Sequence, residues 1–169
     1  MNPPSETKRT QIADFIRQAG LAVLSSTGAE GHPQAALIDI AVMADLTLVF
    51  ETTCGTRKAA NIERDPRVAL VIGWNGPQTL QVEGIAEMAD GRRLDQARET
   101  FLAAFPRKSP DEHWPGNNYY VVTPRWLRFS SYYRPRFIEE YQLQEVPTRR
   151  AGGWRGMLRR HRRENPSAS

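Results

Sequence analysis

The sequence has one cysteine, three histidines and no long apolar run. A single cysteine, Cys54, excludes an internal disulfide bond and any metal site built from several cysteines. His32, His113 and His161 are too far apart for a zinc-ligand spacing, so no metal site is expected. No stretch reaches the roughly 18 apolar residues of a transmembrane helix, and residues 1–11 are too polar for a signal peptide. We therefore expect a cytoplasmic protein.

Positive charge is confined to the C-terminal end. The chain has a net charge of +4, and residues 149–169 contain seven arginines and one glutamate, which leaves residues 1–148 slightly acidic. An acidic body does not favour nucleic-acid binding. We divide the chain into one folded domain, residues 1–145, and a basic tail, residues 146–169. A solvated tail is the first interpretation, and a short basic helix that contacts an anionic membrane or nucleic acid is the alternative.

Hydrophobic periodicity predicts three helices and several short strands. Helices are expected over residues 8–19, 57–64 and 92–105. Strands are expected over 21–27, 35–43, 46–52, 67–74, 79–88, 119–123 and 126–131, with a break at Pro124 and a last short strand over 137–143. The close spacing favours antiparallel hairpins over parallel βαβ units. The pattern indicates an α+β fold, in which closing the sheet into a barrel would remove exposed edges.

The most informative segment is Thr52–Asn61, where the helix over residues 57–64 begins. A helix start presents unpaired backbone N–H groups and the positive end of the helix dipole. Arg57 and Lys58 add two cations there, and together these groups suit a phosphate. A solvated cationic pair is the alternative, but cations alone at this end oppose the dipole. Thr56 can cap the helix and also contact the phosphate.

Five segments in order resemble the pyridoxamine 5′-phosphate oxidase-like family of FMN-binding split barrels. They are Val49–Thr52, Gly55–Ala59, Asn61–Val68, Gln81–Gly84 and Tyr119–Phe129. The resemblance covers roughly residues 8–140. It implies a six-stranded antiparallel split barrel with Greek-key connections and flanking helices. It also implies FMN as the cofactor and a homodimer that holds two flavins at the subunit interface.

The resemblance also implies roles for individual residues. The residues expected to contact FMN are Thr52, Thr53, Thr56, Arg57, Lys58, Gln81, Leu37 and Ile38, the last two through their backbone. The residues expected to cover the flavin or the substrate are Trp126, Arg128 and Arg136. Arg107, Lys108, His113 and Trp114 lie in a loop that can reach the flavin of a partner subunit. The alternatives are a solvent-facing Gln81, a core position for Trp126 or Phe129, and a solvated loop.

Two positions depart from the family pattern. No arginine occurs between Arg17 and Arg57, so the strand segment 36–39 lacks the arginine that leads the flavin-contacting strand of the oxidases. Ile138 stands where the resemblance places the histidine of an Arg-x-His pair that begins at Arg136. Oxidation of pyridoxamine 5′-phosphate is therefore not expected.

The sequence predicts a flavin-dependent oxidoreductase that acts on an unidentified small molecule. A split barrel that binds a deazaflavin or heme, and a non-enzymatic flavin-binding module, are the alternatives. Cys54 precedes a helix start that can lower the pKa of a thiol, but a small packed residue is the preferred interpretation.

Overall fold

The computed structural model describes residues 2–106 and 116–143. Its helices are α1 (Glu6–Ala19), α2 (Arg57–Arg64) and α3 (Gly91–Ala104). Its strands are β1 (Leu21–Thr27), β2 (Pro33–Asp39), β3 (Ala41–Val42), β4 (Leu48–Thr53), β5 (Arg67–Ile72), β6 (Gln78–Met88), β7 (Asn117–Ser131) and β8 (Phe137–Gln142). The predictions for the basic tail and for the loop at residues 107, 108, 113 and 114 fall outside the described residues.

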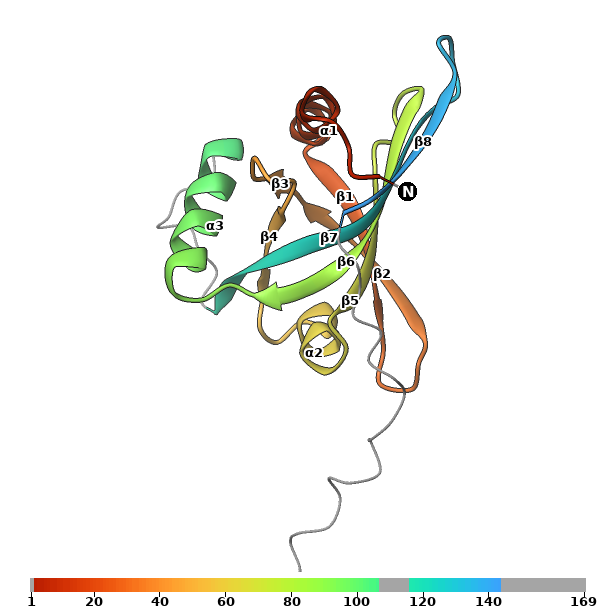
Figure 1. The fold of residues 1–169 in the computed structure, drawn as a ribbon. Coiled ribbons are helices and arrows are strands. Elements are labelled where there is room, and N and C mark those ends of the chain that lie inside the picture. The colour runs from red at the N-terminus through yellow and green to blue at the C-terminus, as the bar shows by residue number, and fades with distance from the viewer. Residues whose placement is uncertain (1, 107–115, 144–169) are drawn as a thin grey trace, which may run out of the picture.

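The strands form one antiparallel sheet that curls into a half-barrel (Figure 1). Its order is β2-β1-β5-β6-β7-β4-β3, and β8 pairs with β7. The strands β2 and β3 end this path, so hydrogen bonding among the described strands leaves the barrel open there. The α+β, split-barrel prediction is confirmed. The last short strand predicted over 137–143 is observed as β8, whereas the strand predicted over 35–43 is divided into β2 and the two-residue β3.

Contrary to the prediction, Pro124 does not interrupt the last long strand. It lies inside β7 opposite Gly84, where the register of the β6–β7 pair shifts between Glu83 and Gly84. A bulge accommodates a residue that lacks a backbone N–H, so the strand continues. A Cβ atom on Gly84 would lie 2.7 Å from the Thr123 carbonyl oxygen. The close approach of the two strands therefore requires glycine at this position.

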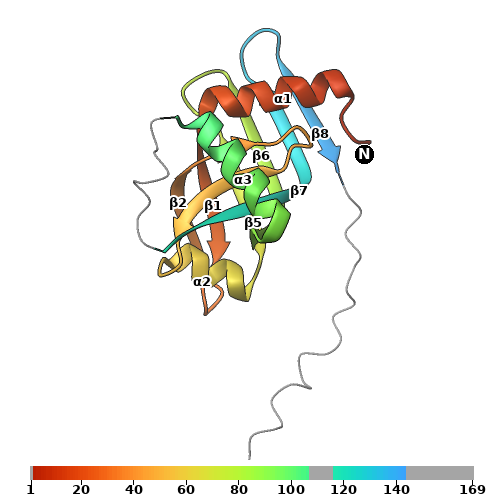
Figure 2. The same ribbon diagram turned by 90° about the vertical axis from the view of Figure 1, so that its left-hand side faces the viewer.

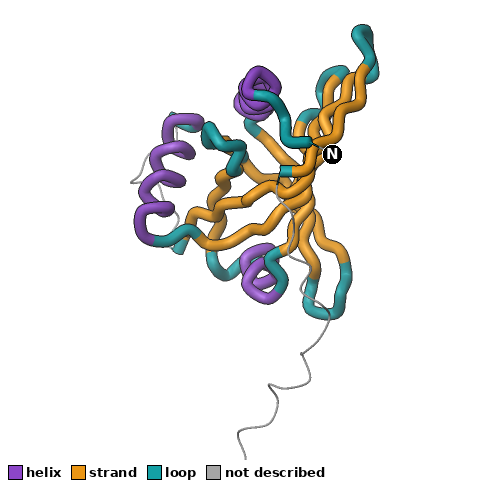
Figure 3. The backbone as a smooth tube through the Cα atoms, in the orientation of Figure 1, coloured by secondary structure: helices purple, strands orange, loops and turns teal. Residues whose placement is uncertain are grey.

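Two apolar clusters stabilise the fold. The larger fills the half-barrel with alternate residues of the strands and with the buried face of α1, and it includes Phe50, Phe129, Leu24 and Ile16. The smaller surrounds Phe101, where α3 packs on β3, β4 and β7 (Figure 2). The described helices lie toward one side of the sheet, and none of them covers its outer face (Figure 3). No helix in the described ranges is both long and apolar enough to cross a membrane.

Lys8 joins α1 to the β7–β8 hairpin. Its Nζ lies 2.7 Å from Oε2 of Glu139 and 5.4 Å and 5.9 Å from the ring centroids of Phe137 and Phe129. The Tyr141 hydroxyl donates to the same carboxylate oxygen at 2.9 Å. The hydrogen bond from Lys8 is the main cause that lowers the pKa of Glu139. Burial, followed by the contact with Glu139, raises the pKa of Tyr141 to about 12.

Replacing Lys8 with methionine should lower the free energy of unfolding by about 0.5–1 kcal/mol at pH 7, because the ion pair is partly exposed. A carboxylate whose pKa is lowered on folding stabilises the native state above its unfolded pKa, here ordinarily 4.5. That contribution disappears as the pH falls through the folded pKa. The difference between wild type and variant should therefore shrink below that pH, as measured by urea unfolding at pH 7 and in acid.

The control for this experiment is Arg17→Met, which breaks the exposed pair between Arg17 and Asp14. It should change stability by no more than a few tenths of a kcal/mol. Equal losses in the two variants, or a Lys8 effect that is independent of pH, would contradict the assigned role.

Candidate functional site

The turn between β4 and α2 positions the predicted phosphate-binding residues. Thr56 is the N-cap of α2, which confirms its predicted capping role, and its hydroxyl accepts from the Ala59 N–H at 3.4 Å. The same hydroxyl donates to the Thr53 carbonyl oxygen at 2.9 Å. The Thr52 hydroxyl lies 3.2 Å from that of Thr56 and must be the donor, because the hydrogen of Thr56 is already used. These hydroxyls therefore hold the turn in place.

The free hydrogen-bond donors at the helix start are two backbone N–H groups. The side-chain hydroxyl of Thr53 is not free, since it donates to Oδ1 of Asn117 at 2.8 Å. Within the described ranges, no hydrogen-bond acceptor faces the backbone N–H groups of Arg57 and Lys58. These are two of the orphan donors that every helix start carries, and the positive end of the dipole lies with them. The first turn of α2 can thus receive an anion.

A pocket of about 300 Å³ lies beside this helix start. Its lining residues are Leu24 and Ser26 of β1, Gln34, Ala35 and Ala36 of β2, and Thr56, Arg57 and Lys58. The lining contains two cations and no carboxylate. Charge-assisted hydrogen bonds to such groups are roughly twice as strong as neutral ones. The chemistry of the pocket therefore fits a phosphate monoester, and the tertiary structure brings Thr56, Arg57 and Lys58 to its wall.

The predicted backbone contacts lie on β2, next to this pocket. Leu37 is 60% exposed on the outer face of the sheet, whereas Ile38 points into the core. β2 pairs only with β1, so one edge of its backbone has no strand partner among the described strands. That edge can offer N–H and C=O groups to a polar ring.

Gln81 lies on the same outer face as Leu37 but far from the pocket. Leu37 is opposite Val23, and Val23 is opposite Val71 in the register of the sheet. Val71 is in turn opposite Gln81, which pairs with Arg128. With strands about 4.8 Å apart, Gln81 is three strands, or roughly 14 Å, from Leu37. One copy of the chain does not bring Gln81 to the phosphate pocket.

The predicted covering residues do not line this pocket. Trp126 is half-buried opposite Glu83 and lines another groove, of about 660 Å³, which shares Ser26 with the pocket, whereas Phe129 belongs to the core. The Nε of Arg128 lies 3.8 Å from a carboxylate oxygen of Glu140. Arg136 is exposed just before β8. Trp126 and Arg128 share one face with Gln81 and form a second group of predicted site residues.

The prediction of a packed Cys54 is wrong. The side chain is exposed in the β4–α2 turn, and its N–H donates to the Gly116 carbonyl oxygen at 3.1 Å. The residue belongs to neither the strand nor the helix, so no apolar face is available to bury it.

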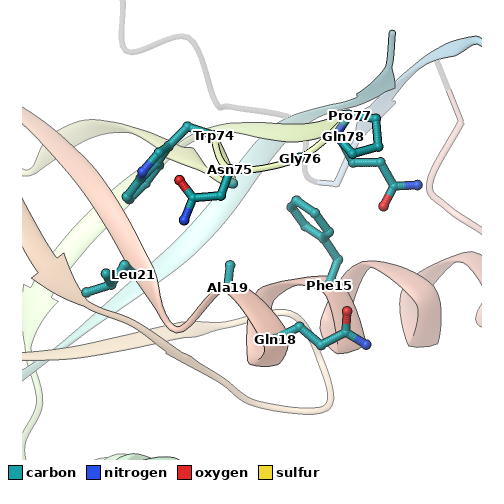
Figure 4. A pocket seen from close by; sticks show the side chains of 10 residues that line it. Phe15, Gln18, Ala19, Leu21, Trp74, Asn75, Gly76, Pro77 and Gln78 are labelled. Carbon is teal, nitrogen blue, oxygen red and sulfur yellow. The ribbon is translucent and has the colours of Figure 1, made fainter. Parts of the chain in front are cut away.

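A further pocket, of about 250 Å³, lies between α1 and the β5–β6 turn. Phe15 of α1 points toward the β5–β6 turn, Gln18 lies along α1, and Trp74 lies beside Asn75 (Figure 4). None of the predicted site residues lines it. Its lining carries amides but no charged group, so it does not fit a phosphate.

Sequence reasoning missed a buried polar network behind the phosphate pocket. Nδ2 of Asn61 donates to the Ser26 hydroxyl and to Oε1 of Gln34, both at 3.0 Å. Arg64 donates to Oδ1 of Asn61 at 3.0 Å and to the Thr27 carbonyl oxygen at 2.7 Å. The available signal was Ser26 itself, a hydroxyl at a core-facing position of a strand that otherwise alternates regularly.

Replacing Thr56 with alanine should lower the free energy of unfolding by about 1 kcal/mol, because the N-cap acceptor of α2 is lost. Thr56→Ser keeps the hydroxyl and should stay within a few tenths of a kcal/mol of wild type. Chemical denaturation without any ligand measures both variants. Equal stabilities for Thr56→Ala and Thr56→Ser would show that the cap does not hold the turn.

A family model and a curated relative both relate this chain to pyridoxamine 5′-phosphate oxidases. A family model described as Pyridoxamine 5′-phosphate oxidase matches residues 9–130. A pyridoxine/pyridoxamine 5′-phosphate oxidase of Anaplasma marginale is 28% identical over 144 residues, which cover 84% of this chain. The alignment covers 62% of that relative, so the chain spans about three fifths of its length.

Two solved structures share the fold. A heme binding protein from Mycobacterium smegmatis superposes with a TM-score of 0.67 at 19% identity, covering 85% of this chain and 60% of that one. General Stress Protein 26 from Bacillus anthracis superposes with a TM-score of 0.63 at 17% identity, covering 80% and 98%. At these identities the likeness concerns the fold.

Proposed function

The chain belongs to the pyridoxamine 5′-phosphate oxidase family, and we propose that it is an FMN-binding oxidoreductase that acts on a small molecule. The observation that carries this proposal is the pocket at the start of α2. Two cations and two free backbone N–H groups meet there without a carboxylate. FMN carries a phosphate dianion, which also removes the conflict between these cations and the helix dipole.

The residues at the start of α2 would hold the phosphate end of FMN. Lys58 supplies a point charge and Arg57 a planar fork, while Thr52, Thr53 and Thr56 keep the turn in position. The unpaired edge of β2 at Leu37 and Ile38 would orient the ring. FMN supplies the hydride chemistry when bound, so the chain need only bind, orient and shield it.

The residues of the second group would complete the site from a second copy of the chain. Gln81 and Arg128 share the outer sheet face with exposed apolar side chains, namely Leu21, Leu37 and Val71. An apolar surface that a monomer leaves exposed is typical of an interface. A homodimer joined through this face would place Gln81, Trp126 and Arg128 of one subunit against the flavin of the other.

The substrate would enter from the side of the β7–β8 hairpin. Arg136 is a cation available to an anionic substrate, and Ile138 is 58% exposed where a histidine would be needed for pyridoxamine 5′-phosphate. We therefore propose a different small substrate for the oxidoreductase.

A deazaflavin that carries a phosphate group is the alternative cofactor, because the same pocket would hold it. Heme presents carboxylates and no phosphate, although one protein of this fold is a heme binding protein. The absorbance spectrum of the purified protein, followed by competition of deazaflavin and heme against FMN, decides between them. Displacement of FMN at equal concentration by either competitor would reassign the cofactor.

Lys58→Ala should weaken FMN binding about tenfold or more, because a charge-assisted contact to the phosphate is lost. Riboflavin, which lacks the phosphate, should bind the variant and the wild type alike. Fluorescence titration with both flavins measures the two dissociation constants. The control is Arg92→Ala, which removes an exposed cation on α3. Failure of the wild type to bind micromolar FMN would refute the proposal.

Leu37→Asp should convert the dimer to a monomer and weaken FMN binding, because it places a charge in the proposed apolar interface. Size-exclusion chromatography with light scattering gives the oligomeric state. Leu94→Asp, at an exposed apolar position on α3, is the matched control and should leave the dimer intact. A monomeric wild type that binds FMN, or a dimeric Leu37→Asp variant, would contradict the shared site.

A further inference from the structure

Ser26 is a polar side chain on the core-facing side of β1. Ala22, Leu24 and Ser26 alternate on that side, and Ser26 is only 7% exposed. Ser26 and Leu24 line the phosphate pocket together with Lys58 and its neighbours at the start of α2. A hydroxyl at such a position needs a polar partner, because a buried polar group without one is destabilising.

The orientation of Asn61 decides what the Ser26 hydroxyl can do. Arg64 donates to the side-chain oxygen of Asn61, and a guanidinium cannot accept a hydrogen bond. The amide NH₂ of Asn61 must therefore face the other way, toward Ser26 and the side-chain oxygen of Gln34. Asn61 is itself 4% exposed, so this arrangement is enclosed.

The Ser26 hydroxyl consequently accepts from Asn61 and keeps its own hydrogen for another partner. Within the described part of the chain, the Ser26 hydroxyl donates no hydrogen bond. The hydroxyl lines the same pocket as Arg57 and Lys58. An anion in this pocket would supply the missing acceptor.

We infer that the Ser26 hydroxyl donates to the phosphate of the bound cofactor and that Asn61 is the positioning residue that directs it. The inference rests on the proposed phosphate pocket. No arginine occurs between Arg17 and Arg57, so the β1–β2 wall of the pocket presents no cation. A neutral hydroxyl from β1, in the same pocket as the cations of α2, gives the phosphate oxygens a donor from the strands as well as from the helix.

The direct test compares Ser26→Ala with Ser25→Ala. The two serines are adjacent on β1 and point to opposite faces, and only Ser26 lines the phosphate pocket. Ser26→Ala should weaken FMN binding about tenfold, the effect of one hydrogen bond to a charged group. Riboflavin binding should change less than about twofold by the same reasoning, and Ser25→Ala should leave both constants unchanged. Equal weakening for both flavins, or no weakening, would overturn the inference.

The positioning role of Asn61 is tested by Asn61→Asp. The carboxylate retains the contact with Arg64 and accepts the Ser26 hydrogen, which withdraws that hydrogen from the ligand. FMN binding should weaken at least as much as in Ser26→Ala, and combining the two changes should add little. Additive losses would show that Asn61 does not act through Ser26.

Inorganic phosphate separates this inference from the cofactor assignment. The wild type should melt at a higher temperature in phosphate than in chloride of equal ionic strength, and Ser26→Ala should lose most of that increase. If the wild type binds no FMN but shows this increase in melting temperature, the assignment of FMN as the cofactor is wrong and the phosphate role of Ser26 stands. An increase that Ser26→Ala retains in full, or no increase at all, would overturn it.

Discussion

Two positive side chains at the positive end of a helix are the arrangement on which the candidate site depends. Arg57 and Lys58 occupy the first turn of α2, where the dipole and the free N–H groups already favour an anion. The local sequence stabilises this helix start but leaves its positive charge uncompensated. The threonine hydroxyls of the turn cap the helix and form hydrogen bonds within the turn. An anion is the group that this helix start lacks.

The rest of the half-barrel holds that helix start against β1 and β2. Asn61 and Arg64 bind the end of β1 and the side chain of Gln34, so α2 cannot shift without breaking these hydrogen bonds, of which the one from Asn61 to Ser26 is buried. The pocket therefore has one wall on a helix and one on strands, and both are fixed before any ligand binds. Such preorganisation reduces the free energy that binding must spend on ordering.

The strand order of the sheet separates two sets of residues that the family resemblance assigns to one flavin site. Lys58 and Gln81 were both predicted to contact the flavin, yet β1 and β5 lie between β2 and the strand that carries Gln81. A flavin that contacts both sets of residues would need a second subunit. The exposed apolar residues Leu37 and Val71, which lie on the same face, are consistent with that arrangement.

Local sequence determined the elements whose signals are local. The bounds of β1 and α2 match the prediction, because regular alternation and an N-cap threonine need no distant partner. Tertiary structure decided that β7 continues through Pro124, because a bulge forms opposite Gly84. It also decided that Cys54 is exposed, because the residue lies in the turn between β4 and α2. The sequence alone predicted Arg57 and Lys58 as anion ligands, since charge at a helix start has a local meaning. Only the fold could bring Ser26 to the same pocket and keep Gln81 away from it, because both depend on strand order.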